Sequence, residues 1–564
     1  MKVQNPILRG FHPDPCFAAA HGKYYLATST FQWLPGVSLY ESDDLVTWRS
    51  VGGALESLDL RGIPDSAGVW APDLTFDEET GLFWLVYTVA KQIDGIFKDV
   101  ENYVVTAPSI EGPWSAPVFI NASGFDPGIY HEGGRHYVLN PQWDPRPLPG
   151  HHKFNGLVLQ EFSLERGLIG EARVVLGNED AVNWLREGPH IMAHDGWYYI
   201  ACAEGGTGRR HRIRMARSQE LWGPYEVCPE PLVCAWCADT PIRKAGHGNF
   251  VQDAEGNWYV CHLCARYLPA GDGAAGTAPV FDEHENGVSP LGRETAMQPV
   301  VWVDGWPRLA SGEIAPASEI DMPCQFGVKP QTGMKGVRPL SCQMPGEVGY
   351  RYETSFEPGM DLWREEWLVP RHIDAERTRC TDTGLLVAGG DSPNSLFDRT
   401  GASRRVTSFN WRAETEVSFV PTHYNQTAGL LVEYDARAFR YLSVGWDEER
   451  GCRVIDVLAN DNGDFTMPLT GDARVTVPAQ AQRIRLAAEV HNADLRFFFA
   501  FDDGAWQPVL TADGSPLVLD AAVMSDERVK GWSYTGTMVG VTCVDMWNKT
   551  ASATFTRFAY EDLA

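Results

Sequence analysis

Gly22-Lys-Tyr-Tyr-Leu26 is the first of five short segments in which a glycine precedes an aromatic run and an aliphatic residue. The other four are Gly81-Leu-Phe-Trp-Leu85, Gly134-Arg-His-Tyr-Val138, Gly196-Trp-Tyr-Tyr-Ile200 and Gly256-Asn-Trp-Tyr-Val260. The copies are 59, 53, 62 and 60 residues apart. Glycine favours a hairpin turn, and aromatic residues favour the strand that follows it. Five such repeats, with almost no helical periodicity, predict an all-β fold that begins with a five-bladed β-propeller over residues 1–322.

A short segment before each repeat glycine is expected to form the innermost strand of its blade. Counted back from the glycine, five titratable residues stand at eight or nine positions: Asp14, Asp73, Asp126, Glu187 and His247. A single Asp-Pro pair is more often a turn former than a catalytic group. Because equivalent positions in successive blades converge on the propeller axis, the shared register instead predicts a ring of titratable groups around a central pocket.

Several carboxylates in one pocket suit acid–base chemistry, because close like charges raise one another's pKa. One carboxylic acid can then donate a proton near neutral pH while its neighbour remains an ionised base. Glycoside hydrolysis uses such a pair. The chain also has 20 Trp, 19 Tyr and 25 Phe residues, and these rings can stack on the apolar faces of sugars.

Charge and length exclude several other classes of protein. The 564 residues predict more than one domain. The formal net charge is −27, and such an acidic surface repels nucleic acid and anionic lipid, so neither is expected as a partner. The N-terminus has no signal-peptide pattern, and no apolar run of about 18 residues occurs, so we expect a cytoplasmic protein without a membrane segment.

Twelve cysteines are scattered along the chain, and we expect reduced thiols rather than a disulfide framework. Two CxxC pairs, Cys234-Ala-Trp-Cys237 and Cys261-His-Leu-Cys264, raise the alternative of a zinc site. The second pair lies in a predicted strand, where residues three apart point to opposite faces. This geometry favours packing over zinc binding.

After Trp306 the repeat stops, and a proline-rich stretch predicts a linker at residues 323–350. From residue 351 to residue 564 short alternating strands are separated by Gly and Asp turns, which predicts an antiparallel β-sandwich of the concanavalin or lectin type.

Several segments of the chain resemble glycoside hydrolase family 43, and within it the two-domain β-xylosidases. The segments are Gly10-Phe-His-Pro-Asp14-Pro, Trp33-Leu-Pro-Gly-Val37, Gly68-Val-Trp70-Ala-Pro72, Ser123-Gly-Phe-Asp126-Pro, Glu187-Gly-Pro-His190, Ala203-Glu-Gly-Gly-Thr207, Lys244-Ala-Gly-His247 and Pro290-Leu-Gly-Arg293-Glu-Thr-Ala296. The resemblance covers the whole chain, and as a set these motifs are highly specific.

The resemblance implies a catalytic triad. Asp14 would be the general base that activates water, Glu187 the general acid, and Asp126 the carboxylate that orients and tunes the acid. The family inverts anomeric configuration, which calls for a base and an acid about 6.5–9.5 Å apart.

The resemblance also implies the substrate-binding residues. Arg293 would donate hydrogen bonds to hydroxyls of the non-reducing-end sugar, and Phe31 and Trp70 would wall the pocket. Trp143 is a further candidate for the wall, as is Trp33, although both could equally be packing residues. Tyr534 would lie on a sandwich loop that closes the pocket and makes the enzyme exo-acting. His247 would tune the base or face a calcium ion, although the mechanism requires no metal or other cofactor.

The implied function is the release of xylose from the non-reducing ends of β-1,4-xylooligosaccharides. An α-L-arabinofuranosidase, or a bifunctional enzyme acting on arabinose-substituted oligosaccharides, remains an alternative with the same triad, and a non-catalytic sugar-binding protein is a remote one. A homo-oligomer is expected. Asp73 and the basic stretch from Arg209 to Arg214 depart from the family pattern, as does Cys16, where Ser is common.

Overall fold

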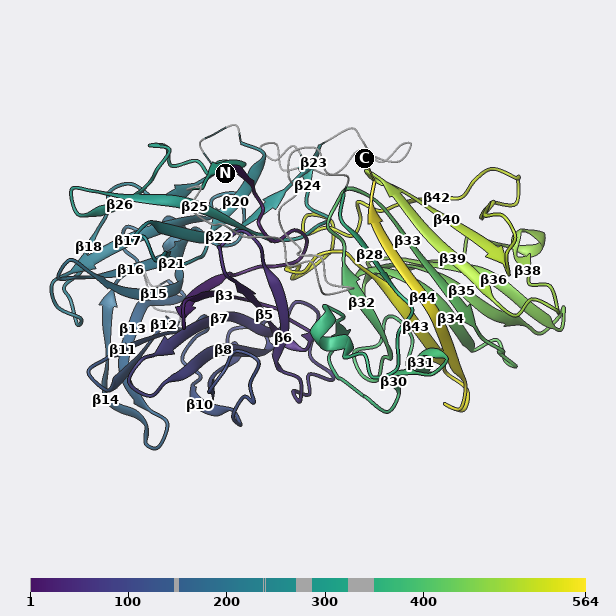
Figure 1. Cartoon of the computed structure of the whole chain (residues 1–564), viewed down its shortest axis with the longest axis horizontal. Helices are drawn as coiled ribbons and strands as arrows, with labels where there is room; N and C mark the ends of the chain where they lie inside the picture. Colours follow the sequence, from purple (N-terminus) through teal and green to yellow (C-terminus); the bar gives the residue numbers. More distant parts are fainter. Residues whose placement is uncertain are drawn as a thin grey trace.

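The computed structural model describes residues 2–146, 152–236, 238, 240–269, 287–322 and 349–563. These residues form two β-rich units that lie side by side, one drawn in purple to teal and the other in green to yellow (Figure 1). The first is a five-bladed β-propeller and the second is a β-sandwich, so the predicted fold class is confirmed. None of the helices among the described residues has the length and apolar character that a membrane crossing needs.

Each blade is an antiparallel sheet whose main strands pair in chain order. The five blades are β2 (Cys16–Ala20), β3 (Lys23–Thr28), β5 (Gly36–Ser42) and β6 (Arg49–Leu55); β7 (Gly68–Asp77), β8 (Leu82–Gln92), β9 (Asp99–Ala107) and β10 (Val118–Asn121); β11 (Gly128–Glu132), β12 (Arg135–Trp143), β13 (Phe154–Ser163) and β14 (Gly167–Leu176); β15 (Arg186–His194), β16 (Trp197–Glu204), β17 (Arg212–Ser218) and β18 (Glu226–Val227); and β20 (Ile242–Gly246), β22 (Trp258–Arg266), β25 (Glu294–Val303) and β26 (Trp306–Leu309).

The repeat has the predicted structural meaning. Each repeat glycine lies in the turn that precedes the second main strand of its blade, and the aromatic run after it forms that strand, β3, β8, β12, β16 or β22. Two short strands extend the blades, β19 (Val233–Cys234) on β17 and β21 (Phe250–Gln252) on β22, while β23 (Leu268–Pro269) and β24 (Gly287–Val288) form a separate two-stranded sheet.

The first strand of every blade has a left-handed kink close to its start or end. The kinked residues, with φ of 52°, 39°, 49°, 51° and 46°, are Asp14, Ala71, Asp126, Gly188 and His247. Bulges accompany three of these kinks, in β7, β15 and β20. A bulge re-aims the side chains beside it, so the kinks are the local feature that shapes the axial site.

The sandwich consists of two antiparallel sheets. One contains β30 (Thr378–Thr381), β31 (Gly384–Ala388), β44 (Ser552–Asp562), β33 (Asn410–Ser418), β39 (Ile484–His491), β40 (Asp494–Phe501) and β41 (Gln507–Pro508), with β28 (Arg351–Thr354) and β42 (Val518–Asp520) at its margins. The other contains β32 (Gly401–Arg405), β43 (Met538–Asp545), β34 (Gln426–Asp435), β35 (Ala438–Asp447), β36 (Cys452–Asp461) and β37 (Asp464–Thr466), with β38 (Val475–Thr476) on β36. Short 3-10 turns are η1 (Val182–Trp184), η2 (Leu362–Glu365) and η3 (Gly471–Ala473).

The sandwich and the propeller are joined by strand pairing and by buried polar contacts. β4 (Trp33–Leu34) of the propeller pairs with β29 (Val369–Pro370) of the sandwich segment. Arg371 binds Asp65 at 2.5 Å, and both side chains are almost fully buried. Within the propeller, β1 (Lys2–Gln4) pairs with β27 (Glu319–Asp321) and brings the two ends of the unit together.

Of the predicted linker, residues 323–350, the structure describes only residues 349 and 350. β27 ends at Asp321 and β28 begins at Arg351, while residues 323–348 lie outside the described residues, so the domain boundaries remain a prediction. Of the two CxxC pairs, Cys237 is also outside them. Cys261 and Cys264 pack in different hydrophobic clusters, as expected for residues three apart in a strand.

Candidate active site

The three predicted catalytic carboxylates come from three blades and are all buried. Asp14 lies in the turn before β2, Asp126 in the turn before β11, and Glu187 near the start of β15. Their exposed fractions are 5%, 7% and 7%. The charges of Asp14 and Glu187 contribute to the pKa of Asp126, so the three groups are close enough to interact. The structure therefore brings the predicted triad together.

Asp14 is held as an ionised carboxylate. Its Oδ2 accepts a hydrogen bond from the Ser29 hydroxyl at 2.7 Å, and its Oδ1 accepts one from the Arg293 guanidinium at 3.1 Å. Burial alone would raise the pKa of Asp14, but Arg293, His247 and Ser29 hold it below its ordinary value. An ionised, partly stabilised carboxylate can accept a proton from water.

The pKa values of Glu187 and Asp126 are raised, whereas that of Asp14 is lowered. Burial, followed by the charge of Asp14, raises the pKa of Glu187 to about 7. Burial and the charge of Glu187 raise the pKa of Asp126 well above its ordinary value, against a hydrogen bond from the Gly188 backbone. Two coupled carboxyl groups of this kind retain a proton as a pair near neutral pH. The pocket thus holds a base beside a proton donor.

Three aromatic rings form one wall of the site. The Phe31 ring lies 6.1 Å from that of Trp70 and 6.0 Å from that of Tyr534, and the last two are 6.2 Å apart, centroid to centroid. The Arg293 guanidinium lies over Phe31 and Tyr534, at 5.2 and 5.3 Å from the ring centres. Two of its five N–H donors are used by Asp14 and by the Tyr534 carbonyl oxygen, and its buried Nε has no hydrogen-bond partner among the described residues.

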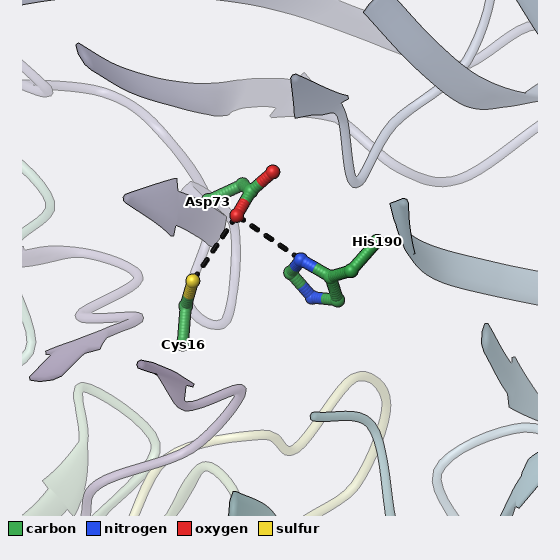
Figure 2. Close-up of side chains that lie close together, drawn as sticks. All are labelled: Cys16, Asp73 and His190. Carbon is green, nitrogen blue, oxygen red and sulfur yellow. Dashed lines mark hydrogen bonds and ion pairs between the residues drawn. The ribbon is translucent and has the colours of Figure 1, made fainter. Parts of the chain in front are cut away.

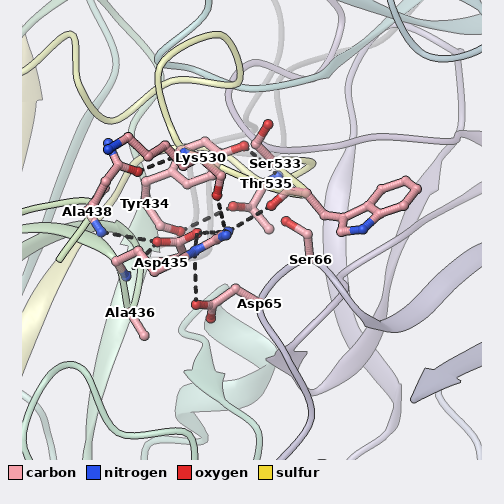
Figure 3. A network of polar contacts seen from close by, with 12 residues as sticks. Asp65, Ser66, Tyr434, Asp435, Ala436, Ala438, Lys530, Ser533 and Thr535 are labelled. Carbon is pink, nitrogen blue, oxygen red and sulfur yellow. Dashed lines mark hydrogen bonds and ion pairs between the residues drawn. The ribbon is translucent and has the colours of Figure 1, made fainter. Parts of the chain in front are cut away.

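The loop that carries Tyr534 is held by contacts to the propeller and to the sandwich; Figure 3 shows Ser66 of the propeller near Tyr434 and Thr535 of the sandwich. The Tyr534 backbone N–H donates to the Ser66 hydroxyl of the propeller at 2.9 Å. The next residue, Thr535, donates its N–H to the Tyr434 hydroxyl at 3.1 Å. Arg437 binds the carbonyl oxygen of Trp532 at 2.7 Å and lies 3.6 Å from Asp65 of the propeller.

The rim of the site contains two residues that the sequence did not reveal, Lys98 and Trp532. Lys98 Nζ lies over Trp143 at 4.9 Å and over Trp532 at 4.6 Å, so it bridges the two rings. Trp532 Nε1 also donates to Asp94 at 2.7 Å. Trp143 is therefore a rim residue rather than part of the inner wall. Trp33, only 1% exposed in β4, is a packing residue.

His247 lies on the axis beside the base. Its Nδ1 is 3.8 Å from Asp14 Oδ1, and burial lowers its pKa to about 4, so the ring is neutral near pH 7. Calcium takes six to eight oxygen ligands, waters included, and Asp14 offers one carboxylate beside this ring. Calcium binding at His247 stays a prediction. Two other groups have metal-ligand side chains close together: Cys16, Asp73 and His190, and Asp77, His131 and His136.

Asp73 does not occupy the place that its register predicts. The kink of blade two is at Ala71, so Asp73 stands two residues beyond it, with 3% of its surface exposed. It contacts Cys16 and His190 rather than joining the ring of pocket residues. The expected ring of four carboxylates therefore contains three, together with His247.

Arg209 and Arg214 of the basic stretch form contacts within the fourth blade, whereas His211 of the same stretch, which the sequence did not single out, contacts the fifth. Arg214 lies 3.3 Å from the buried Glu204, and Arg209 stacks on Trp236 at 4.2 Å. His211 is buried and bonded to the Lys244 carbonyl at 3.0 Å, behind His247. The contact between His211 and Lys244 could be seen only in the folded propeller, because nothing in the local sequence distinguishes His211 from its basic neighbours.

Comparisons with known proteins identify the family of the chain. Residues 3–307 match the model of Glycosyl hydrolases family 43, and residues 363–561 match the Beta xylosidase C-terminal Concanavalin A-like domain. The chain is 34% identical to Beta-xylosidase of Bacillus subtilis strain 168 over 100% of both chains. It is 37% identical to Xylosidase/arabinosidase 43B of Humicola insolens, over 99% of this chain and 97% of the relative.

A solved structure is similar over almost the whole chain. The crystal structure of xylan β-1,4-xylosidase from Bacillus halodurans C-125 has a TM-score of 0.85 and 34% identity to this chain, covering 99% of it and 100% of the relative. Its match extends over the propeller and the sandwich together. On these matches, the chain belongs to glycosyl hydrolases family 43 and is a glycoside hydrolase.

Proposed function

We propose that the protein is an exo-acting β-xylosidase that releases xylose from the non-reducing ends of β-1,4-xylooligosaccharides with inversion of configuration. The observation that carries the proposal is the opposite tuning of two buried carboxyl groups. The pKa of Asp14 lies below its ordinary value, and that of Glu187 is raised to about 7. Relatives named as β-xylosidases over their full length support the choice of sugar.

In this mechanism Asp14 takes a proton from a water molecule as that water attacks the anomeric carbon. Glu187 gives its proton to the leaving oxygen, so the bond to the rest of the oligosaccharide breaks as the new bond forms. The charge of Glu187 raises the pKa of Asp126, so these two carboxyl groups hold a proton as a pair before the reaction. Arg293 offers the remaining N–H donors of its guanidinium to hydroxyls of the terminal sugar.

Exo action is supported by the sandwich loop. Tyr534 packs against Phe31 and Trp70, so this side of the site is occupied by protein rather than by an open cleft. A site that is closed on one side accepts a chain end and releases a single sugar.

The test compares initial rates on 4-nitrophenyl β-D-xylopyranoside and 4-nitrophenyl α-L-arabinofuranoside, with NMR of the sugar released from xylobiose. A dominant xyloside rate with α-xylose as the first product supports the proposal. A dominant arabinofuranoside rate with little xylobiose cleavage transfers the function to the arabinofuranosidase alternative. No rate on any substrate leaves a sugar-binding protein as the remaining reading.

A further inference from the structure

Asp73 lies in a second ring of side chains beneath the catalytic pocket. The residues two positions after the five kinks are Cys16, Asp73, Gly128, His190 and Asn249, and we call them the second ring. Asn249 donates to the Cys16 sulfur at 3.1 Å, and Cys16 in turn donates to Asp73. A Cβ on Gly128 would stand 3.4 Å from Asp73 Oδ2, so this glycine leaves room for the carboxylate.

Asp73 accepts three hydrogen bonds, two of which are drawn in Figure 2. Its Oδ1 contacts the Cys16 thiol at 3.1 Å and His190 Nδ1 at 3.0 Å, and its Oδ2 accepts from the Ile129 backbone N–H at 2.7 Å. A carboxylate can only accept, so Nδ1 of His190 carries the proton. Burial raises the pKa of the Cys16 thiol well above its usual range, so the sulfur remains a donor.

Each of these three donors belongs to a segment that also carries a catalytic carboxylate. Cys16 is two residues after Asp14, Ile129 is three residues after Asp126, and His190 is three residues after Glu187. Blade two itself has Ala71 at the kink and offers no carboxylate to the pocket. Its contribution to the site is made one layer lower, through Asp73.

The chemistry of the contact calls for a carboxylate at position 73. Asp73 is 3% exposed, so its charge is stabilised by hydrogen bonds from the three donors, Cys16, His190 and the Ile129 backbone. Burial of a charge without such partners is costly. An asparagine has one acceptor oxygen and a two-proton amide, so it would turn a donor toward at least one of the three donors.

We propose that Asp73 is a positioning residue that fixes the base, the acid and the tuning carboxylate relative to one another. This proposal rests on the proposed function in one respect: it takes from it the roles of Asp14, Glu187 and Asp126. Since reacting groups misplaced by about 1 Å can lose about 100-fold in rate, a tie shared by all three segments acts directly on turnover.

The first experiment measures Asp73→Asn against Asp253→Asn. Asp253 is 6% exposed and accepts hydrogen bonds from Asn257 and Tyr259 in an outer hairpin of blade five, so it is a matched buried carboxylate away from the triad. We expect Asp73→Asn to fold and to lose about 100-fold in kcat with KM changed less than about threefold. Asp253→Asn is expected to retain kcat within about twofold while losing stability. A folded Asp73→Asn enzyme with near-normal kcat overturns the proposal.

The variants Cys16→Ala and His190→Ala each remove one hydrogen bond to Asp73. They also test the proposal if Asp73→Asn does not fold. Cutting the tie to the base segment at Cys16 should lower rates on xylobiose and on aryl glycosides alike. Cutting the tie to the acid segment at His190 should lower the xylobiose rate more, because aryl leaving groups need little protonation. Cys16→Ser keeps a donor and should restore most of the loss. Equal losses on both substrates for both alanine variants, or no rescue by serine, would indicate a merely structural role.

The two proposals fail in different ways. The wild-type rates on the xyloside and the arabinofuranoside test the proposed function. The variant-to-wild-type ratio, taken on whichever glycoside the enzyme cleaves, tests the positioning role. A wild-type arabinofuranosidase with a 100-fold loss in Asp73→Asn would retain the role of Asp73 and replace only the substrate.

Discussion

Asp14 and Glu187 share one buried pocket, but their pKa values are shifted in opposite directions. Asp14 has a guanidinium and a hydroxyl as direct partners, whereas Glu187 has burial and a nearby negative charge. The difference in environment assigns the roles, since the group that is easily ionised suits the base and the group that retains its proton suits the acid.

Glu187→Ala is expected to lower the rate on xylobiose by about 10²–10⁴-fold, the usual contribution of a general acid. The rate on an aryl xyloside with a good leaving group should fall far less, because that oxygen leaves without protonation. Steady-state kinetics on both substrates measure the split. Asp14→Ala is the control, because water activation is needed for every substrate and both rates should collapse. An equal loss on both substrates in Glu187→Ala would move the acid elsewhere.

The pH profile follows from the same two groups. Activity requires Glu187 protonated and Asp14 ionised, so kcat/KM on xylobiose should fall as pH rises through about 7, the pKa of Glu187. At the acid end it should persist below the ordinary pKa of an aspartate, because that of Asp14 is lowered. An alkaline limb far from pH 7 would contradict the assignment of Glu187 as the acid.

The blade kinks explain how far the repeat could predict the site. The kinked residue of each blade precedes its repeat glycine by 8, 10, 8, 8 and 9 residues, in chain order. Counting back eight or nine residues therefore finds the kinked residues Asp14, Asp126 and His247. In blade four the count finds Glu187, which is next to the kinked Gly188. Blade two has a longer first strand, β7, and the same count selects Asp73 instead of Ala71. A sequence repeat fixes the spacing of turns, but it does not locate a bulge inside a strand.

Gly188→Ala tests the kink beside the acid. Gly188 has φ of 51°, and a Cβ there would lie 2.4–2.7 Å from three atoms of the His247 ring. We expect a loss of roughly 1–3 kcal/mol in unfolding free energy from overpacking, with a fall in kcat as Glu187 and His247 shift. Gly196→Ala in the same blade is the control, with φ of 77° and open space around its Cβ. If both variants retain full activity, the kink does not position the acid.

At the scale of the whole molecule, docking of the sandwich completes the site. The sandwich strands could be predicted from local patterns. Lys98 and Trp532 could not, because residues 434 positions apart meet only when the two units dock. The contacts of Lys244 in the propeller could not be predicted either. Its Nζ lies 2.6 Å from Glu527 and 3.1 Å from Asp526, both in the sandwich.

Lys244→Met should uncouple the two units. The Lys244 side chain is 6% exposed, and its removal leaves two buried carboxylates without their cation. Breaking a buried pair in this way costs about 3–5 kcal/mol. Lys23→Met is the control, since Lys23 is 39% exposed beside Glu41 and such surface pairs contribute about 0–1 kcal/mol.

Calorimetry measures the outcome. If the buried contacts make propeller and sandwich one cooperative unit, the wild type and Lys23→Met should unfold in one transition, and Lys244→Met in two, or in one at a clearly lower temperature. The KM for xylobiose should rise in Lys244→Met, because Asp526 and Glu527 precede the loop that carries Tyr534 and hold it against the propeller. An unchanged transition and an unchanged KM would show that strand pairing at β4 and β29 and the Arg371 contact to Asp65 are sufficient to dock the sandwich.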